Sequence, residues 1–294
     1  MGPDATTAVV TDTTAYLPDE LAAEHGIHRV SLYVTLEGEQ RRESEISDAE
    51  YDDFYERLRR SADGATTSQP SVGDFTTVYE PLLDECRDIV SIHISSGISG
   101  TYQAALQARQ ELADSGRGAE RIRVWDSRSA CGGQGLMVLA AANAAARGAS
   151  GEQAMQEVER ARDALQMWFA VDTLEYLRRG GRIGSAQAWL GSALQIKPIL
   201  TLAEEVTPVE RVRTGRRAFE RLVECARERE ADGADAWVVQ HIHDPDAARR
   251  LVDECRQVFE RDPVFVSEIG PVIGAHVGPG LLGVGGIPRA LLGL

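Results

Sequence analysis

Cysteine is scarce in this sequence of 294 residues, and basic residues are outnumbered by acidic ones. The four cysteines lie far apart without a CxxC pair, so no metal-ligand spacing appears and a reducing compartment is indicated. The 31 Lys and Arg residues face 46 Asp and Glu residues, which gives a net charge of −15. This balance disfavours a nucleic-acid partner and membrane docking by charge alone, because both need clustered basic residues.

Long apolar runs are also missing from the sequence. Residues 1–10 have neither a basic start nor a long apolar stretch, so they are not expected to form a signal peptide. The apolar run at residues 136–146 is too short to cross a bilayer. We therefore expect a cytoplasmic protein. Hydrophobic residues make up 43% of the chain and charged residues 26%, which is typical of a globular protein able to enclose a cavity.

The first half of the chain alternates short β-like runs with helical stretches. Strands are expected at residues 8–11, 29–36, 89–95 and 122–125, and helices at 48–61, 71–84, 101–115 and 132–146. This repetition predicts a parallel sheet with right-handed crossovers, flanked by helices. Ligands of such sheets lie beyond the carboxyl ends of the strands, which points to Asp12, Ser95–Ser96 and Asp126–Ser127.

A domain boundary is expected at the turn of residues 148–151, so that the domains cover 1–150 and 151–294. Residues 199–202 and 206–212 are expected to pair as a hairpin, so the second α/β domain should have a mixed or antiparallel sheet. Residues 264–294, rich in Gly and Pro, are expected to form strands and turns. The other elements expected here are helices 152–165, 174–178, 185–194, 219–229 and 247–259 and strands 167–171, 236–242, 264–269 and 280–284.

Three polar segments have the residue types that hold an anion. In residues 67–71 (Thr-Ser-Gln-Pro-Ser), Pro70 keeps the preceding residues extended beside a helix start. Residues 95–102 combine Ser and Gly between a strand and a helix, without a Rossmann or Walker pattern. Residues 126–133 follow another strand, and Cys131 there is expected to be packed rather than reactive. A helix cap and a Gly-rich turn explain the first two segments equally well.

Two further segments suit an amphiphile with an anionic head. Basic residues surround a Gly turn at Arg178–Arg182, and residues 190–200 form a mostly apolar stretch; a surface charge cluster beside a core helix is the alternative. A second basic cluster lies at Arg211–Arg217. His276 lies in a Gly/Pro-rich stretch, where its imidazole can donate to a carboxylate or phosphoryl oxygen, or simply be structural. The other histidines form no metal-ligand pattern.

Taken together, these five segments resemble the DegV family. The resemblance runs from Val9-Val10-Thr11-Asp12-Thr13-Thr14 to His276-Val277-Gly278-Pro279-Gly280. It implies two α/β domains with a long-chain fatty acid between them and no other cofactor. Some members serve as the lipid-presenting subunit of bacterial fatty acid kinase, in which a separate catalytic subunit phosphorylates the fatty acid for phospholipid synthesis. Transient contact with a membrane is compatible with that role.

The resemblance also assigns residues to the site. Thr67 and Ser96 match carboxylate-binding hydroxyls, with the adjacent Ser95 open as the second donor. Arg213 matches a basic residue near the phosphoryl-transfer end, and His276 matches the histidine of the head-group network. Val277 stands where the family usually has Thr, which puts a polar role there in doubt. Gly285-Gly286-Ile287-Pro288 has no assigned place. No catalytic residue and no metal ligand are implied.

Hydroxyl donors fit the chemistry of this ligand. Burial contributes about 0.8 kcal/mol per methylene, or roughly 10 kcal/mol for a long tail, whereas a buried carboxylate needs hydrogen bonds. The chain has neither a Walker loop nor a kinase signature, so we expect no ATP-dependent activity from it alone.

Three other functions stay open. The first is a serine hydrolase or acyltransferase that uses Ser96 or Ser99 with His276 and an aspartate, Asp12 or Asp126, although no GxSxG elbow appears. The second is a lipid carrier without a kinase partner. The third, a nucleotide-binding α/β domain, is disfavoured by the missing phosphate loop.

Overall fold

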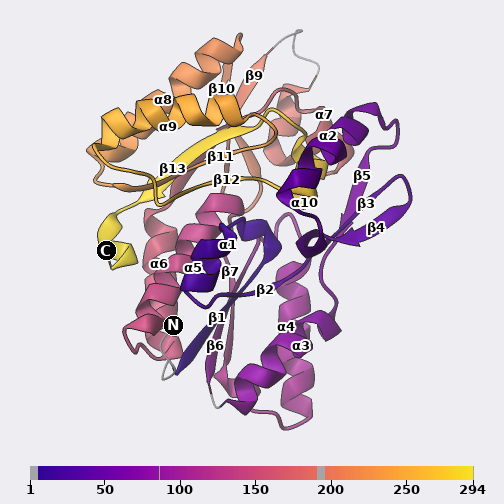
Figure 1. Cartoon of the computed structure of the whole chain (residues 1–294), viewed down its shortest axis with the longest axis vertical. Helices are drawn as coiled ribbons and strands as arrows, with labels where there is room; N and C mark the ends of the chain where they lie inside the picture. The colour runs from indigo at the N-terminus through magenta and orange to yellow at the C-terminus, as the bar shows by residue number, and fades with distance from the viewer. Residues whose placement is uncertain (1–5, 86, 191–195, 294) are drawn as a thin grey trace. The chain divides into compact units, whose positions relative to one another are not determined.

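The computed structural model describes residues 6–85, 87–190 and 196–293, and it divides into two compact units. Unit 1 comprises Met1–Leu32, Gln69–Leu165 and Pro288–Leu294. Unit 2 comprises Tyr33–Ser68 and Gln166–Ile287. Figure 1 shows the elements of both units coloured along the chain.

These units differ from the single boundary expected at residue 150. Residues 33–68 belong with the second half of the chain because they form their own sheet and bond to residues 269–276. Residues 288–293 belong with the first half, where the Asn143 side-chain amide donates to the Leu292 carbonyl at 2.9 Å. A single cut cannot describe contacts between segments this far apart in sequence.

Unit 1 is built on a four-stranded parallel sheet, as the alternating pattern predicts. Its order is β2 (His28–Val30), β1 (Thr7–Asp12), β6 (Asp88–His93) and β7 (Ile122–Asp126). The α-helices are α1 (Asp19–Glu24), α3 (Val72–Asp84), α4 (Thr101–Asp114), α5 (Cys131–Ala146) and α6 (Gly151–Ala164). Single-turn 3-10 helices lie at η1 (Thr13–Ala15), η4 (Ala119–Arg121) and η6 (Arg289–Leu292).

The helices of unit 1 cover both faces of the sheet. Alternate residues of β1, Ala8 and Val10, pack with Phe75 of α3 and Ala104 of α4 in one core cluster. Helix α5 lies on the other face, where Gln134 donates to Thr11 at 3.0 Å (Figure 1). Nearly every residue of α5 is buried, which explains its apolar run as that of a core helix. No described helix is long and apolar enough to cross a membrane.

Unit 2 contains a six-stranded mixed sheet, as expected. Its order is β10 (Val206–Val212), β9 (Lys197–Leu202), β8 (Gln166–Ala170), β13 (Leu282–Ile287), β11 (Ala236–His241) and β12 (Phe265–Glu268). Only the β11–β12 pair is parallel, and β9 with β10 forms the expected hairpin. Helices α8 (Gly215–Ala231) and α9 (Pro245–Phe259) share one core cluster with this sheet, which includes Leu222, Trp237 and Leu251. Gly285 and Gly286, unplaced by the sequence, lie in the inner strand β13.

The remaining part of unit 2 is a small antiparallel sheet of order β4 (Glu39–Arg42), β3 (Tyr33–Leu36) and β5 (Ala65–Ser68). Between β4 and β5 lie η2 (Glu43–Glu45), η3 (Asp48–Glu50) and helix α2 (Tyr51–Arg60). The single strand expected at residues 29–36 is therefore two strands, β2 and β3, in different units. Strands β4 and β5 were not predicted because they are short and polar, without an apolar face.

The expectation of only strands and turns in residues 264–294 is wrong at residues 271–277. Helix α10 (Pro271–Val277) carries His276. Pro271 at its first position is already in a helical conformation, and tertiary packing outweighs the low helix propensity of Gly274. Helix α7 (Glu175–Arg179) forms near its expected position. The helix expected at 185–194 is instead the 3-10 turn η5 (Gly184–Trp189), and residues 191–195 lie outside the described residues.

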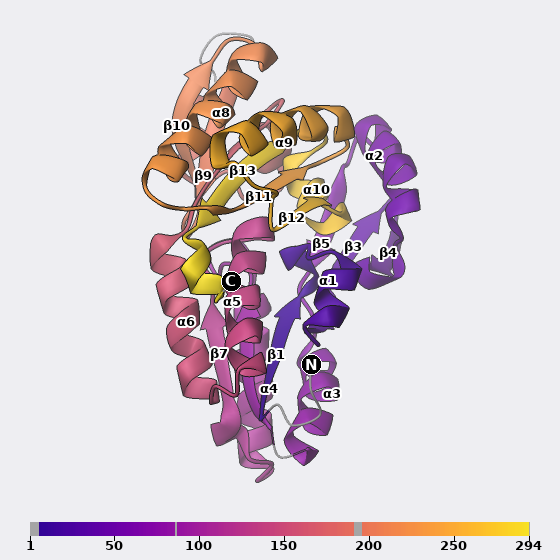
Figure 2. The ribbon, with the colours of Figure 1, turned by 60° about the vertical axis from the view of Figure 1, so that its left-hand side comes forward.

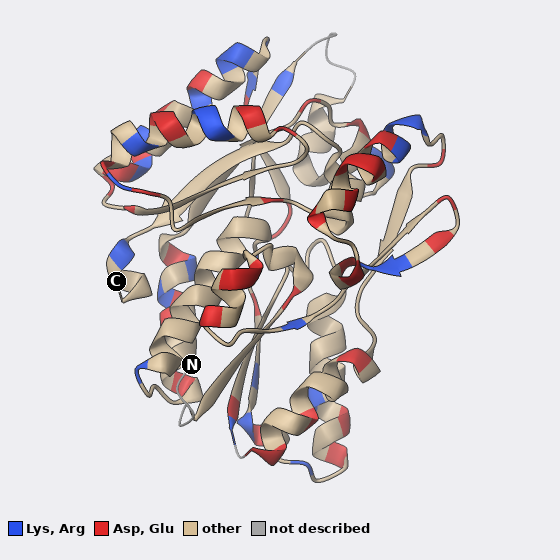
Figure 3. Ribbon diagram, viewed as in Figure 1, with Lys and Arg blue, Asp and Glu red and all other residues tan. Residues whose placement is uncertain are grey.

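The expected basic patches are largely neutralised by ion pairs. Figure 3 shows both signs of charge along α8 and α9. In α8, Arg216 and Arg217 pair with Glu220 at 2.9 and 3.2 Å. In α7, Arg178 and Arg179 both pair with Glu175, at 2.6 and 2.8 Å. Within the cluster Arg211–Arg217, Arg216 and Arg217 are therefore neutralised by side-chain pairs, whereas Arg213 is exposed.

Candidate functional site

Two of the residues assigned by the family resemblance meet in unit 2. Thr67 on β5 and His276 on α10 are 209 residues apart, yet Thr67 Oγ1 lies 2.7 Å from His276 Nε2. Strand pairing fixes Thr67, which lies opposite Val34 of β3. Thr67 and His276 are both half-buried, so the pair lies near the surface of the unit. The structure therefore joins a hydroxyl and an imidazole in one hydrogen-bonded pair.

The imidazole of His276 is neutral at physiological pH. Burial, helped by the charge of Arg182, lowers the pKa of His276 from 6.5 to about 4. Its Nδ1 atom is buried and has no hydrogen-bond partner among the described residues. Nδ1 faces Gly180, where an added Cβ would lie only 2.3 Å away.

These features assign the proton of the ring. An unpaired buried acceptor is tolerated more often than an unpaired donor, so we place the proton on Nε2. Nε2 then donates to the Thr67 hydroxyl oxygen. The hydroxyl hydrogen of Thr67 is left to donate to another acceptor. A ligand carboxylate or phosphoryl oxygen has the required chemistry.

Arg182, which the sequence places only within a basic cluster, acts on His276 through its charge. Its guanidinium Nη1 donates to the Gly180 carbonyl at 2.7 Å, in the turn that follows α7. Its charge acts on His276 and opposes protonation of the ring. The signal in the sequence was the pair of glycines before Arg182, because they allow the turn after α7 from which the charge of Arg182 acts on His276.

Arg213 is exposed on the turn between β10 and α8. Within the described ranges, no hydrogen bond or ion pair links it to Thr67 or His276. Its assignment to the phosphoryl-transfer end stays a prediction.

Ser95 and Ser96 follow β6 in unit 1, and only Ser96 is exposed. Ser95 is fully buried, and its hydroxyl accepts from the Gly97 amide at 3.2 Å. Its carbonyl accepts from the amides of Ile98 and Ser99, both at 3.1 Å. Ser95 therefore shapes the turn, whereas Ser96 is the serine with an accessible hydroxyl.

Asp126, at the end of β7, holds this turn from the neighbouring strand. Its carboxylate accepts from the Ser96 hydroxyl at 2.5 Å and from the Ser96 amide at 3.1 Å. It also accepts from the Arg128 amide at 2.9 Å. Arg128 and the half-buried Cys131 both have left-handed backbone conformations, with φ of 47° and 55°. The carboxyl ends of two adjacent strands thus meet at a polar edge, as the sequence predicts.

Asp12, at the end of β1, belongs to a buried network that the sequence analysis missed. Burial alone would raise the pKa of Asp12, but the hydrogen bond and charge of His93, with bonds from Thr14 and Ile94, keep it below its ordinary value. His93 Nδ1 donates to Asp12 at 3.0 Å, and His93 Nε2 lies 2.7 Å from the Ser91 hydroxyl. Ser91 and His93 are two residues apart on β6 and therefore point to the same face of the sheet. This spacing was the signal in the sequence for the network.

The residues considered for a hydrolase do not form a serine–histidine–aspartate series through His276, whose Nε2 bonds to Thr67. Asp12 bonds to His93, the Ser96 hydroxyl donates directly to Asp126, and the Ser99 hydroxyl lies 2.8 Å from the Thr101 hydroxyl. The hydrogen bonds run from Asp12 through His93 to Ser91, in the same order as in a hydrolase triad. All three residues are, however, 0% exposed. A substrate cannot reach Ser91, so this network is structural.

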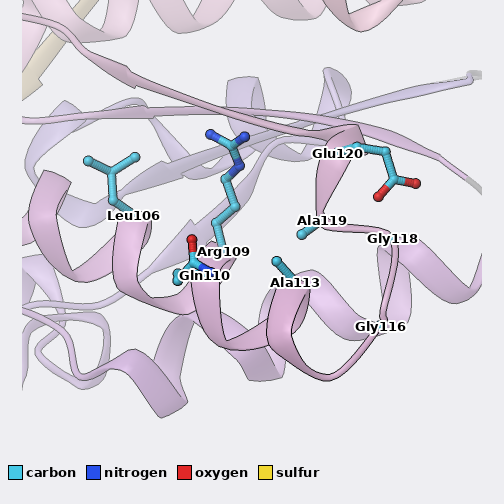
Figure 4. Close-up of a pocket in the computed structure, with 8 residues that line it drawn as sticks. All are labelled: Leu106, Arg109, Gln110, Ala113, Gly116, Gly118, Ala119 and Glu120. Carbon is cyan, nitrogen blue, oxygen red and sulfur yellow. The ribbon is translucent and has the colours of Figure 1, made fainter.

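An open pocket of about 620 Å³ lies elsewhere in unit 1 (Figure 4). It is lined by the end of α4 and by η4, including Arg109 and Glu120. Because η4 leads into the start of β7, this pocket lies at the amino end of the sheet, away from Ser96 and Asp126. Among the described residues, no group of three or more His, Cys, Asp and Glu side chains could hold a metal ion.

Comparisons with known proteins agree on one family. The family model described as an uncharacterised protein of the DegV family matches residues 6–289. The chain is 37% identical to protein DegV of Bacillus subtilis, over 94% of this chain and 97% of that protein.

Solved structures of this family have the same fold. A DegV family protein from Thermus thermophilus, described by its fatty acid binding, matches with a TM-score of 0.85 and 37% identity, over 96% of this chain and 99% of that one. DegV from Bacillus subtilis, described as a fatty acid-binding protein, matches with a TM-score of 0.81 and 35% identity, over 96% and 99% of the two chains.

Proposed function

Because this chain belongs to the DegV family, we propose that it binds one long-chain fatty acid and holds the carboxylate through hydroxyl groups. The observation that carries this proposal is the Thr67–His276 hydrogen bond, which leaves the Thr67 hydroxyl hydrogen to donate beside a neutral imidazole. The fatty acid-binding relatives support the ligand class.

Uncharged donors can replace the water that a fatty acid carboxylate loses when it is buried. Each buried methylene of the tail contributes about 0.8 kcal/mol, and the carboxylate loses its water only if hydrogen bonds replace it. Thr67 supplies one donor. Ser96 is the proposed second donor on the strength of the family resemblance, and its hydroxyl donates to Asp126 in the structure. The positive charge of Arg182, which acts on His276, also favours an anionic head group.

The bound carboxylate is presented to a separate kinase subunit in the cytoplasm, which forms an acyl phosphate for phospholipid synthesis. The chain has no Walker loop or kinase signature of its own, which supports a presenting role rather than a catalytic one. Arg213 is exposed and is assigned to the phosphoryl-transfer end. Fatty acid is the ligand, and no other cofactor is required.

The carboxylate site is tested by native mass spectrometry of freshly purified protein, followed by extraction under denaturing conditions. Wild type should carry one fatty acid, and Thr67→Ala combined with Ser96→Ala should carry none. Thr66→Ala is the matched control, because Thr66 is adjacent on β5 but points to the other face. Normal retention of fatty acid by the double variant would reject the assigned residues.

The kinase role is tested separately, by measuring acyl phosphate from ATP and fatty acid. The purified chain alone should form none, and addition of a fatty acid kinase catalytic subunit should start the reaction. Arg213→Ala should slow phosphorylation without releasing fatty acid. Acyl phosphate formed by the chain alone would contradict the presenting role, and a carrier without a kinase partner would show binding but no reaction.

A further inference from the structure

The segment that carries Thr67 also binds the helix that carries His276. Tyr55 of α2 is fully buried, and its hydroxyl donates to the Ile269 carbonyl at 2.6 Å, just before α10 begins. The same hydroxyl packs on Gly274, where an added Cβ would lie 2.3 Å from it. Figures 1 and 2 both show α2 beside α10.

A second contact fixes the start of the same helix. Glu43, which follows β4, is almost fully buried and accepts from the Val272 amide at 2.8 Å. Val272 is the second residue of α10. A carboxylate at a helix start satisfies an amide that has no partner within the helix. Glu43 and Tyr55 thus contact α10 at its start and along one side.

Thr67 is tied to these two contacts by the small sheet. Thr67 on β5 lies opposite Val34 of β3, and β3 also pairs with β4, which leads into Glu43. The segment of residues 33–68 therefore supplies both the Thr67 hydroxyl and the contacts that locate α10. The 2.7 Å separation of Thr67 Oγ1 and His276 Nε2 depends on how α10 is seated.

We infer that Tyr55 is a positioning residue for the fatty acid carboxylate, acting through α10 and His276 rather than touching the ligand. This inference rests on the proposed function for its effect on affinity. The ring of Tyr55 packs on Phe54 and His243, with ring centres 5.3 and 5.7 Å away, so phenylalanine can keep that packing. The hydroxyl is the part that holds the chain entering α10.

The test is Tyr55→Phe measured in two backgrounds. In wild type, the dissociation constant for a long-chain fatty acid should rise about tenfold, because a buried hydrogen bond to the segment entering α10 is lost. In Thr67→Ala, where His276 has no hydroxyl to orient, the same change should have little further effect. A non-additive cycle of this kind separates positioning from general destabilisation. Equal losses in both backgrounds would overturn the inference.

The ring of His276 gives a readout that needs no fatty acid. In nitrogen NMR of the unloaded protein, Tyr55→Phe should shift the His276 Nε2 signal, assigned by its loss in His276→Gln. An unchanged signal would overturn the inference even if fatty acid binds. A shifted signal in a protein that binds no fatty acid would keep the positioning contact and reject the proposed function instead.

Tyr79→Phe is the matched control. Tyr79 is also fully buried, and its hydroxyl lies 2.7 Å from the Ser91 hydroxyl in unit 1. This variant should lower thermal stability while leaving the His276 signal in place. If Tyr79→Phe shifts the His276 signal as much as Tyr55→Phe does, the effect is not specific to α10 and the inference fails.

Discussion

At the scale of single residues, the proposed carboxylate site depends on one neutral imidazole held between a hydroxyl and a glycine. His276 contacts Thr67 through Nε2 and Gly180 through Nδ1. Thr67 and His276 were identified by resemblance to a family, whereas Gly180 was not assigned a role. Its importance comes from contact with a side chain 96 positions later, which no local pattern contains.

Gly180→Ala should weaken fatty acid binding and lower stability by about 1–3 kcal/mol, because the new methyl group overlaps His276. The backbone of Gly180 has φ of −73°, so alanine causes no backbone strain there. Gly215→Ala is the control, since nothing lies within 4 Å of its added Cβ and α8 begins at that residue. Ligand titration and thermal unfolding measure both effects. Equal behaviour of the two variants would contradict the overlap.

The pKa of His276 gives stability a predictable pH dependence. It is 6.5 for an ordinary histidine and about 4 in the folded chain, with burial as the main cause. Between these values the unfolded chain binds a proton that the folded chain does not. The free energy of unfolding should therefore keep this contribution above about pH 6.5 and lose it as the pH falls toward 4.

His276→Gln isolates this contribution. Glutamine keeps an amide donor but does not titrate, so the fall in unfolding free energy between pH 6.5 and 4 should be shallower in the variant. Denaturant unfolding at a series of pH values measures the difference. Parallel curves for wild type and variant would show that His276 does not titrate in this range.

At the scale of elements, β13 shows how glycine allows close packing of strands. Added Cβ atoms at Gly285 and Gly286 would lie 2.5 and 2.6 Å from the carbonyl oxygens of Gln166 and Ala236. These oxygens belong to the strands on either side of β13. Backbone atoms cannot move aside as a flexible side chain can, so the two glycines are required by the neighbouring strands.

Gly285→Ala should lower the free energy of unfolding by more than about 2 kcal/mol. Gly73→Ala near the start of α3 is the control, because its nearest neighbour, Ser71 Oγ, is 3.7 Å from the added Cβ. That variant should change stability by less than about 1 kcal/mol. Chemical denaturation compares the two, and equal stabilities would mean that the strands can separate at little cost.

Elements with strong local signals were predictable, and those that depend on distant partners were not. The parallel strands β1, β6 and β7 follow from apolar runs between helices, and the hairpin β9–β10 from its short connection. Helix α10 was missed because Gly274 and Pro271 argue against a helix until Tyr55 and Glu43 are in place beside it. Strand β5 was missed because its polar residues pair with β3 rather than cover a core.

At the scale of the whole molecule, the chain passes between units four times, so neither half of the sequence is a unit. A fragment of residues 1–150 leaves segment 33–68 without α10 and unit 1 without α6 and η6. We expect that fragment to show no cooperative unfolding transition, whereas the full chain shows one under the same conditions. Circular dichroism during thermal unfolding distinguishes these outcomes. A cooperative fragment would mean that α6 and η6 are dispensable for the folding of unit 1.

The repeated passage of the chain between the units also affects the order in which the units can fold during synthesis. Unit 2 consists of an early segment, Tyr33–Ser68, and a late segment, Gln166–Ile287. The early segment stays exposed until the late segment has been synthesised. Unit 1 needs η6, which leaves the ribosome later still. Unit 2 can therefore complete its sheet before unit 1 receives its final helix, although unit 1 began first.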